Sequence, residues 1–255
     1  MKSVLLRLEG PLQSWATQSK FEVRDTDLEP SKSAILGLVG SAFGMERDDD
    51  VQLAILRKLS AAMRVDRQGS VLRDYHTAGG GRFRGATEHG KRKYFVYDDD
   101  EGRVGSNCIP SQRYYLQDAA FTVALSGDDD LVERVASALR SPRWPLYLGR
   151  RACVPSCPVL LGVVDGSAHE AVRNAPLADR RDPVGEGELE RLRLIVEAPP
   201  EDGGEPRYDE PLSFRMGAKR YGVRYVKTEW MDVPSADVPS ATAAPARPLD
   251  GGTSP

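Results

Sequence analysis

The stretch Ala119-Ala-Phe-Thr-Val-Ala-Leu-Ser-Gly-Asp-Asp-Asp-Leu-Val-Glu-Arg-Val-Ala-Ser-Ala-Leu139 carries the clearest structural signal in the chain. Its first seven residues are almost entirely apolar and predict a buried strand. Beyond three aspartates, apolar residues recur from Leu131 to Leu139 at the spacing of one helix face, and the aspartates suit the N-terminus of a helix. The stretch therefore predicts a strand followed directly by a helix.

The N-terminal part of the chain shows the same order of elements. Alternating residues from Val4 to Leu8 predict a strand, and residues 31–44 predict a helix with a serine cap at its start and a glycine at its end. Strands expected at 61–67 and 157–164 complete two strand–helix–strand units. This order predicts an α+β fold with a ferredoxin-like βαββαβ core and a small β region near the C-terminus.

Composition divides the chain into three parts. Residues 78–113 are rich in glycine and basic residues, and Lys93-Tyr-Phe-Val-Tyr97 precedes an acidic turn, which predicts an inserted β-hairpin. Residues 1–77 and 114–233 then form the globular domain. Residues 234–255 are mostly Pro, Ala, Ser, Thr and Gly, so we expect this tail to be disordered.

The bulk properties exclude several classes of protein. The formal net charge is −3, which is not typical of a free-standing nucleic-acid binder. Three cysteines, an odd number, argue against a disulfide framework and for a reducing, cytoplasmic location. The first residues do not resemble a signal peptide, and no window approaches the length of a membrane span.

The cations nevertheless gather in local patches. Pro142-Arg-Trp-Pro-Leu-Tyr-Leu-Gly-Arg-Arg151 holds three arginines and two aromatic residues without an acid, and 82–93 and 215–227 are also rich in Lys and Arg. Arginine binds phosphate and aromatic rings stack on unpaired bases, so the first stretch predicts a site for single-stranded nucleic acid. The equally weighted alternative is a surface turn with Trp144 and Tyr147 packed inward.

A catalytic role has weaker signals. Enzymes that cut RNA without a metal use His, Lys or Tyr for proton transfer, and His76 lies in Arg73-Asp-Tyr-His-Thr77. We favour the alternative that Asp74 or a backbone carbonyl merely orients His76 within a turn. No paired histidine or carboxylate motif indicates a metal site, and we predict no cofactor.

Five blocks, taken in order, resemble the CasD family, the fifth Cas family of the type I-E CRISPR complex Cascade. The resemblance runs from about residue 2 to residue 164. It implies a fold of the RNA-recognition (RRM) and repeat-associated (RAMP) type, with the inserted hairpin as the family's thumb. The blocks are Gly10-Pro-Leu-Gln-Ser-Trp15, Pro30-Ser-Lys-Ser-Ala-Ile-Leu-Gly-Leu-Val-Gly40, Leu72-Arg-Asp-Tyr-His-Thr77, Leu116-Gln-Asp-Ala-Ala-Phe-Thr-Val-Ala-Leu125 and Pro142 to Arg151.

The resemblance implies a non-catalytic subunit that holds the repeat-derived 5′ handle of CRISPR RNA and caps the backbone of the complex in antiviral defence. The implied partners are the CRISPR RNA, the CasC backbone and the large CasA subunit, with target DNA reached through the complex and no membrane. Fifth-family members of type I-C systems do cut precursor RNA, so a metal-independent endoribonuclease remains the alternative, with His76 and Tyr75 nearest in kind to its catalytic groups. A protein-only adaptor is the second alternative.

A hooked single strand needs cations for phosphates, rings for splayed bases and close backbone approach. We therefore expect contacts from the basic loop, from the start of the first helix and from the Leu72 block, with a separate set on the thumb. The expected RNA contacts are Lys32, Arg73, Tyr75, His76, Arg143, Trp144, Tyr147, Gly149, Arg150 and Arg151. The expected thumb contacts are Arg82, Arg84, Lys91, Arg92 and Lys93.

Overall fold

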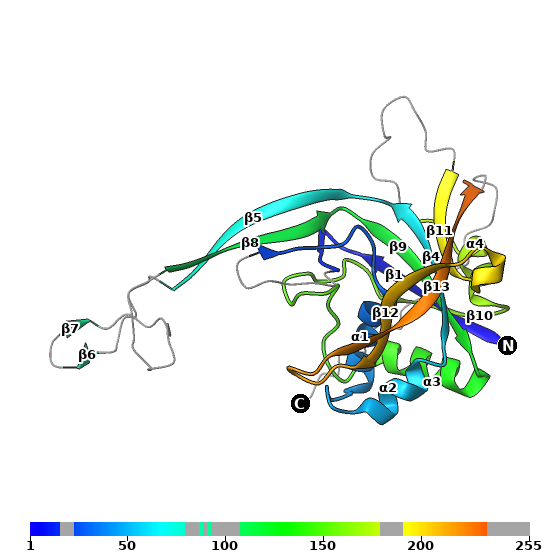
Figure 1. Ribbon diagram of the computed structural model, residues 1–255, viewed down its shortest axis with the longest axis horizontal. Helices are drawn as coiled ribbons and strands as arrows, with labels where there is room; N and C mark the ends of the chain where they lie inside the picture. Colours follow the sequence, from blue (N-terminus) through cyan, green and yellow to red (C-terminus); the bar gives the residue numbers. More distant parts are fainter. Residues whose placement is uncertain (16–22, 80–86, 89–90, 93–107, 179–190, 234–255) are drawn as a thin grey trace, which may run out of the picture.

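A seven-stranded sheet in the order β10-β1-β9-β4-β11-β13-β12 forms the centre of the molecule. The computed structural model describes residues 1–15, 23–79, 87–88, 91–92, 108–178 and 191–233. The sheet belongs to a body from which a long two-stranded arm extends (Figure 1). The predicted tail at 234–255 lies outside the described residues.

The described elements follow in chain order. They are β1 (Lys2–Glu9), β2 (Leu12–Gln13), β3 (Val23–Arg24), α1 (Lys32–Phe43), α2 (Asp50–Leu56), β4 (Ser60–Arg67), β5 (Ser70–Gly79), β6 (Thr87–Glu88), β7 (Lys91–Arg92), β8 (Cys108–Gln117), β9 (Ala120–Gly127), α3 (Asp129–Arg140), β10 (Leu160–Asp165), α4 (Ala168–Asn174), β11 (Arg191–Glu197), the 3-10 turn η1 (Pro200–Asp202), β12 (Glu205–Ser213) and β13 (Arg220–Asp232).

Four strands at one end of the sheet frame the two helical units. β1 pairs antiparallel with β9 and β10, and β9 pairs antiparallel with β4. Helices α1 and α2 connect β1 with β4 by way of loops and short strands, and α3 lies between β9 and β10. The predicted C-terminal β region is continuous with this sheet, because β11 pairs with β4 from Arg193 opposite Val65 to Val196 opposite Ala62.

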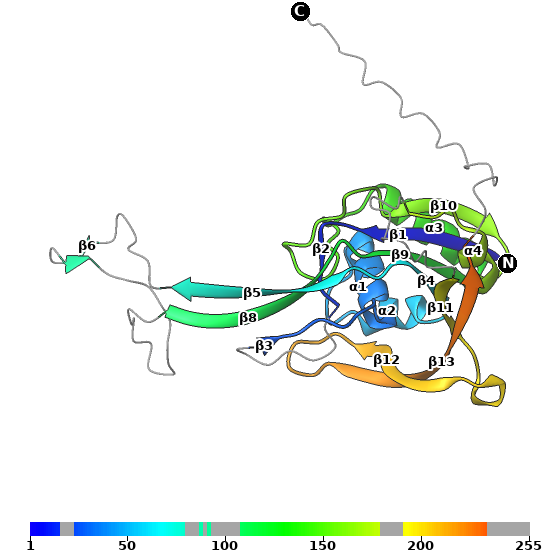
Figure 2. The same cartoon turned by 90° about the horizontal axis from the view of Figure 1, so that it is seen from above.

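Helices cover both faces of the sheet. Val4, Leu6 and Leu8 of β1 belong to a core shared with α1 and α3, whereas Leu5 packs with α4 on the opposite face. The sheet also curls, so that the edge strand β12 contacts α1 and α2 (Figure 2). This curl brings the C-terminal strands beside the first helix.

The ends of α1 are confirmed as predicted. The Ala34 N–H donates to the hydroxyl of Ser31, the N-cap residue, at 3.2 Å. Gly44 ends the helix at a φ of 68°, a left-handed conformation that glycine adopts without strain. Both caps are local sequence signals, which is why they were readable from the chain alone.

The arm is longer at its base than we expected. β5 pairs with β8 along its full length, from Ser70 opposite Gln117 to Gly79 opposite Cys108. The ladder therefore begins at Ser70, before the boundary expected at residue 78. Gly69, at a φ of 70°, makes the turn that redirects the chain from β4 into the arm. The strands predicted around Lys93 to Tyr97 lie outside the described residues.

A buried arginine, Arg64, anchors α4 on the face of the sheet opposite to α1 and α3. The Arg64 side chain is fully buried and forms an ion pair with Asp66 at 2.5 Å. Its remaining N–H groups donate to the carbonyls of Val172, Ala175 and Pro176 at 2.9 to 3.0 Å, with a longer bond to a fourth carbonyl. The last carbonyls of a helix have no partner within the helix, so Arg64 satisfies the C-terminal end of α4.

We expect Arg64→Met to lower the free energy of unfolding by about 3–5 kcal/mol, the cost of breaking a buried ion pair. Chemical denaturation measures this change, and hydrogen exchange should accelerate first in α4. Arg173→Met is the control, because that side chain is partly exposed and contacts Glu229 only at 3.9 Å. Equal stability of the two variants would contradict the anchoring role.

Candidate nucleic-acid interface

A groove of about 1270 Å³ lies between α1, the loop 142–151 and the tip of the β12–β13 hairpin. Three aromatic rings and four exposed cations line it, against two carboxylates, those of Glu46 and Asp48. We call this cavity the groove. The rings are Trp144, Tyr147 and Phe214, and the cations are Arg47, Arg151, Arg215 and Lys219.

Small residues of α1 form the floor of the groove. Gly37 and Ser41 line it, and the Ser41 hydroxyl turns back to donate to the Gly37 carbonyl at 3.0 Å. This face of α1 therefore has no large side chains, and side chains of the loop 142–151 and of the β12–β13 tip lie beside it. Glycine has no Cβ atom, so another segment can approach this face of the helix closely.

The loop 142–151 is fastened to the C-terminal end of α1. The Arg143 N–H donates to the Ala42 carbonyl at 2.9 Å, and the Trp144 N–H donates to the Ser41 carbonyl at 3.3 Å. Trp144 is 36% exposed and Tyr147 is half-buried, and both line the groove, so neither ring is packed fully inward as the alternative expected. Arg143 contributes to docking the loop and is not among the residues that line the groove.

Gly149 approaches the protein's own backbone. Its φ is 98°, and a Cβ atom added there would lie 1.8 Å from the Ser14 carbonyl oxygen. The neighbouring Leu148 carbonyl accepts from the Ser14 N–H at 3.0 Å. The expected close approach is therefore intramolecular: it packs the loop against the segment after β2, which is a correction to the RNA contact predicted from sequence.

Arg150 is also directed into the protein. Its guanidinium donates to the carbonyls of Tyr114, Arg24 and Asp25 at 2.7 to 3.2 Å and stacks over the Tyr115 ring at 4.8 Å from the ring centroid. These contacts join the loop to the base of the arm. Of the two adjacent arginines predicted to bind phosphate, Arg151 lines the groove. Arg150 instead binds backbone carbonyls of β3 and β8.

Lys32 is not a phosphate site. Its side chain is 5% exposed, and its Nζ lies 2.9 Å from carboxylate oxygens of both Glu197 and Glu210. Its backbone N–H donates to Asp209 at 2.9 Å, so a carboxylate already occupies the N-terminus of α1. The sequence could not reveal this, because the three acids lie on strands far away in the chain.

Asp209 is held in its ionised form. Burial raises the pKa of this carboxyl, but hydrogen bonds from Arg224 at 2.6 and 2.9 Å and from the Lys32 N–H outweigh it, so the pKa lies below its usual range. The ion-pair cluster of Lys32, Asp209, Glu210, Arg224 and Glu197 thus ties α1 to β11, β12 and β13.

The residues predicted on the Leu72 block lie on the arm. Arg73, Tyr75 and His76 are in β5 and are not among the residues that line the groove. Neighbouring residues of a strand project to opposite faces, so Tyr75 and His76 do not converge on one point. The His76 Nδ1 lies 3.9 Å from a carboxylate oxygen of Asp74, the orienting partner expected from sequence.

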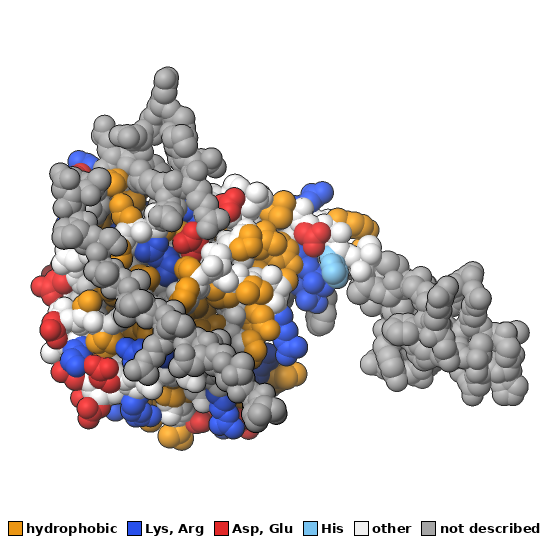
Figure 3. Space-filling view, turned by 180° about the vertical axis from the view of Figure 1, so that it is seen from behind, with side chains coloured by type: hydrophobic (Ala, Val, Ile, Leu, Met, Phe, Trp, Pro, Cys, Tyr) orange, Lys and Arg blue, Asp and Glu red, His pale blue; other side chains and the backbone are white. Residues whose placement is uncertain are grey.

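The arm leaves the body beside other cations. Figure 3 shows a histidine side chain next to Lys and Arg side chains at this point, with hydrophobic side chains gathered on the adjoining part of the body. Of the expected thumb contacts, Arg82, Arg84 and Lys93 lie outside the described residues. Lys91 and Arg92 lie in the short strand β7, which pairs with β6.

A family model described as CRISPR-associated protein (Cas_Cas5) matches residues 3–227. The chain belongs to this Cas5 family. The CRISPR system Cascade subunit CasD of Escherichia coli (strain K12) is 35% identical over 176 residues, which cover 64% of this chain and 72% of that protein. Among solved structures, a chain of a CRISPR RNA-guided surveillance complex is 34% identical, with a TM-score of 0.71 and 91% of both chains covered. A crystal structure of a Cas protein is also 34% identical, with a TM-score of 0.64 and coverage of 90% of this chain and 95% of that chain.

Part of the groove in this Cas5-family chain was missed by sequence reasoning. Arg47, Phe214, Arg215 and Lys219 join Trp144, Tyr147 and Arg151 there. The available signal was the run 215–227, which holds five cations and no acid. Nothing in the sequence showed that this run would lie opposite the loop 142–151.

Among the described residues, no group of three or more His, Cys, Asp or Glu is arranged to hold a metal ion. No helix in the described part of the chain is long and apolar enough to cross a membrane.

We expect Gly149→Ala to destabilise the protein by about 1–3 kcal/mol from backbone strain alone, because alanine disfavours the left-handed conformation and its Cβ would clash with Ser14. Thermal unfolding measures the effect. Gly162→Ala is the matched control, since nothing lies within 4 Å of its added Cβ. A Gly149→Ala protein as stable as Gly162→Ala would show that the loop does not depend on this contact.

We expect Asp209→Asn to reduce the free energy of unfolding at neutral pH by about 3 kcal/mol, because it leaves Arg224 buried without its closest carboxylate. Since folding lowers the pKa of Asp209, its contribution is complete above about pH 4 and declines as the pH falls through the folded pKa. The difference from wild type should therefore shrink below about pH 4 in denaturant titrations. Asp202→Asn, at an exposed position, should show little effect at any pH.

Proposed function

We propose that this chain is a non-catalytic, CRISPR RNA-binding subunit of a Cascade-type surveillance complex, where it holds the repeat-derived 5′ handle and caps the backbone. The observation that carries the proposal is the groove, in which three rings and four cations face one cavity. The similarity to CasD and to a chain of an RNA-guided surveillance complex supports it. A cytoplasmic location, inferred from cysteine usage, is part of the same proposal.

We also infer that β1, β4, β9 and β10 form a ferredoxin-like core. Their spatial order β10-β1-β9-β4, with helices between the first and second and between the third and fourth strands of the chain, supports this reading. The strands β11, β12 and β13 extend the core, and the turn between β12 and β13 supplies one wall of the groove. The groove is therefore built at the junction of the core and its extension.

The chemistry of the groove suits single-stranded RNA. The Trp144, Tyr147 and Phe214 rings offer faces for unpaired bases, which stack on aromatic side chains regardless of sequence. Arg151 and Lys219 are exposed cations that neutralise phosphates. An acidic protein can bind RNA in this way because the binding cations are local and the remaining surface is free for other contacts.

The arm supplies a separate surface in this proposal. Its strands β5 and β8 extend away from the body, and the Tyr75 side chain is 66% exposed (Figure 1). We assign the arm, with Arg73, Tyr75 and His76, to contacts with guide RNA and the neighbouring CasC backbone subunit. The large CasA subunit is the other proposed protein partner, and target DNA is reached only through the complex.

The two alternatives have less support. An endoribonuclease would need groups that converge on a scissile phosphate, and Tyr75 and His76 project to opposite faces of β5. A protein-only adaptor would not need aromatic rings and cations gathered in one cavity. Sequencing the 5′ ends of RNA that co-purifies with the tagged protein separates these ideas: uniform ends with one short repeat-derived tag support handle binding, whereas absence of RNA favours the adaptor.

We expect Arg151→Ala with Lys219→Ala to weaken binding of a labelled single-stranded oligoribonucleotide. The slope of log affinity against log salt should fall by about 0.7 for each phosphate that the variant no longer neutralises. Fluorescence anisotropy at several salt concentrations measures both quantities, and Lys58→Ala, at an exposed position outside the groove lining, is the control. A double variant with wild-type affinity and salt slope would refute the groove as the RNA site.

A further inference from the structure

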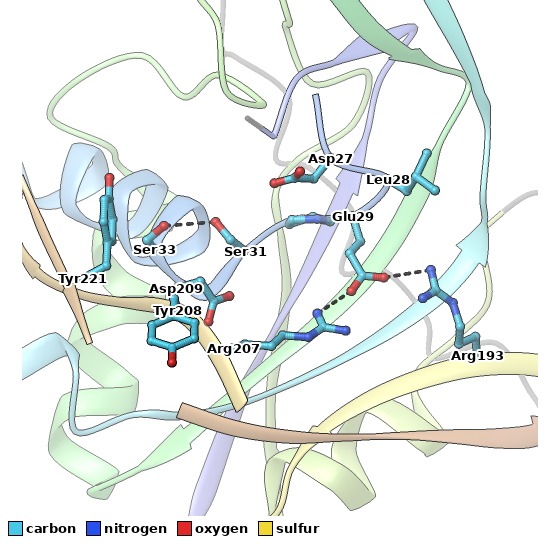
Figure 4. A pocket seen from close by; sticks show the side chains of 11 residues that line it. Asp27, Leu28, Glu29, Ser31, Ser33, Arg193, Arg207, Tyr208, Asp209 and Tyr221 are labelled. Atoms are coloured by element: carbon cyan, nitrogen blue, oxygen red, sulfur yellow. Dashed lines mark hydrogen bonds and ion pairs between the residues drawn. The ribbon is translucent and has the colours of Figure 1, made fainter. Parts of the chain in front are cut away.

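A second cavity, of about 790 Å³, adjoins the groove. It lies between the segment 27–33 and the strands β11, β12 and β13, and Ser33 lines both cavities. Figure 4 shows Tyr221 and Ser33 on one side of it and Leu28 and Glu29 on the other, with Asp27 across from Tyr208. A chain lying in the groove therefore meets this cavity at the start of α1.

Two tyrosine rings stand at this second cavity. Tyr208 of β12 is 74% exposed and Tyr221 of β13 is 40% exposed, so part of each ring is accessible to a ligand. Partial burial raises the pKa of Tyr221 above its ordinary value. The Ser31 and Ser33 hydroxyls, 3.0 Å apart, lie nearby and can each donate or accept a hydrogen bond.

Both arginines and two of the carboxylates that line the second cavity are paired within the protein. Glu29 pairs with Arg193 at 2.7 Å and also with Arg207, and Asp209 is bound by Arg224. The lining thus holds no excess of cations, in contrast to the groove. A phosphate gains little here, whereas a flat, neutral and polar group gains stacking and hydrogen bonds.

We propose that the second cavity holds an unpaired nucleobase of the same RNA strand whose backbone lies in the groove. The base stacks on Tyr208 or Tyr221, and its polar edge meets the serine hydroxyls and the carboxylate side of the cavity. This inference rests on the proposed function and deepens it: the groove supplies affinity through phosphate contacts and stacking that is independent of sequence, and the second cavity reads one base. Because most of the hydrogen-bonding groups of the cavity accept or are hydroxyls, it favours a base that carries an exocyclic amino group (adenine, cytosine or guanine) over uracil, which has none.

The test compares probes with and without bases. Affinities of the full chain are measured for homopolymeric oligoribonucleotides of A, C and U and for an abasic ribose-phosphate oligomer of equal length. We expect Tyr208→Ala and Tyr221→Ala each to lower the affinity for the A and C oligomers about tenfold and to leave the abasic oligomer unaffected. Tyr208→Phe and Tyr221→Phe should keep most of the affinity, because the ring is retained.

The controls separate this inference from the proposed function. Tyr225→Ala removes an exposed tyrosine outside the cavity and should not change binding. Equal reductions on base-bearing and abasic probes, or no reduction at all, would overturn the base site while leaving the groove intact. If wild-type protein and the Arg151→Ala, Lys219→Ala variant bind every probe equally, the proposed function fails as well. Tyrosine variants that bind RNA normally but release neighbouring subunits from the purified complex would assign the cavity to a protein partner and so also overturn the base site.

Discussion

The buried ion-pair cluster at the start of α1 is the interaction on which the binding surface depends. Lys32 bridges Glu197 of β11 and Glu210 of β12, and Asp209 caps the helix while it binds Arg224 of β13. Buried ion pairs add little net stability, yet removing one partner leaves a charge stranded in a low-dielectric interior. The cluster therefore fixes where the three C-terminal strands lie relative to α1, and both cavities lie on that junction.

The wall of the groove that the loop 142–151 forms depends on backbone geometry. The loop 142–151 follows α3, and its backbone hydrogen bonds hold it against the end of α1. Gly149 permits a contact with Ser14 that no other residue could make, and Arg150 connects the loop to β3 and to the base of the arm. Residues that do not line the groove thus maintain its volume, while Trp144, Tyr147 and Arg151 remain accessible to a ligand.

The two cavities differ in the chemistry that they offer to a ligand. The groove combines three rings with more cations than carboxylates, whereas the second cavity combines two tyrosine rings and two serine hydroxyls with no excess of cations. The separation follows from the pairing of charges: arginines near the second cavity are bound by carboxylates, whereas Arg151 and Lys219 are exposed. Composition alone, with its net charge of −3, conceals this arrangement.

The sequence by itself determined the local features: the caps of α1 at Ser31 and Gly44, the strand and helix between Ala120 and Arg140, and the gathering of rings and cations at 142–151. These depend on neighbours within a few residues, and so periodicity and residue type reveal them. Only the tertiary structure decided which cations face a ligand. From the sequence, Lys32, Arg150 and Arg151 are equally good candidates for binding phosphate. In the structure, carboxylates far away in the chain bind Lys32 and distant backbone carbonyls bind Arg150, whereas Arg151 lines the groove. These distant acids and carbonyls reach Lys32 and Arg150 only when the sheet packs around α1. A pattern of neighbouring residues in the sequence therefore cannot predict these contacts.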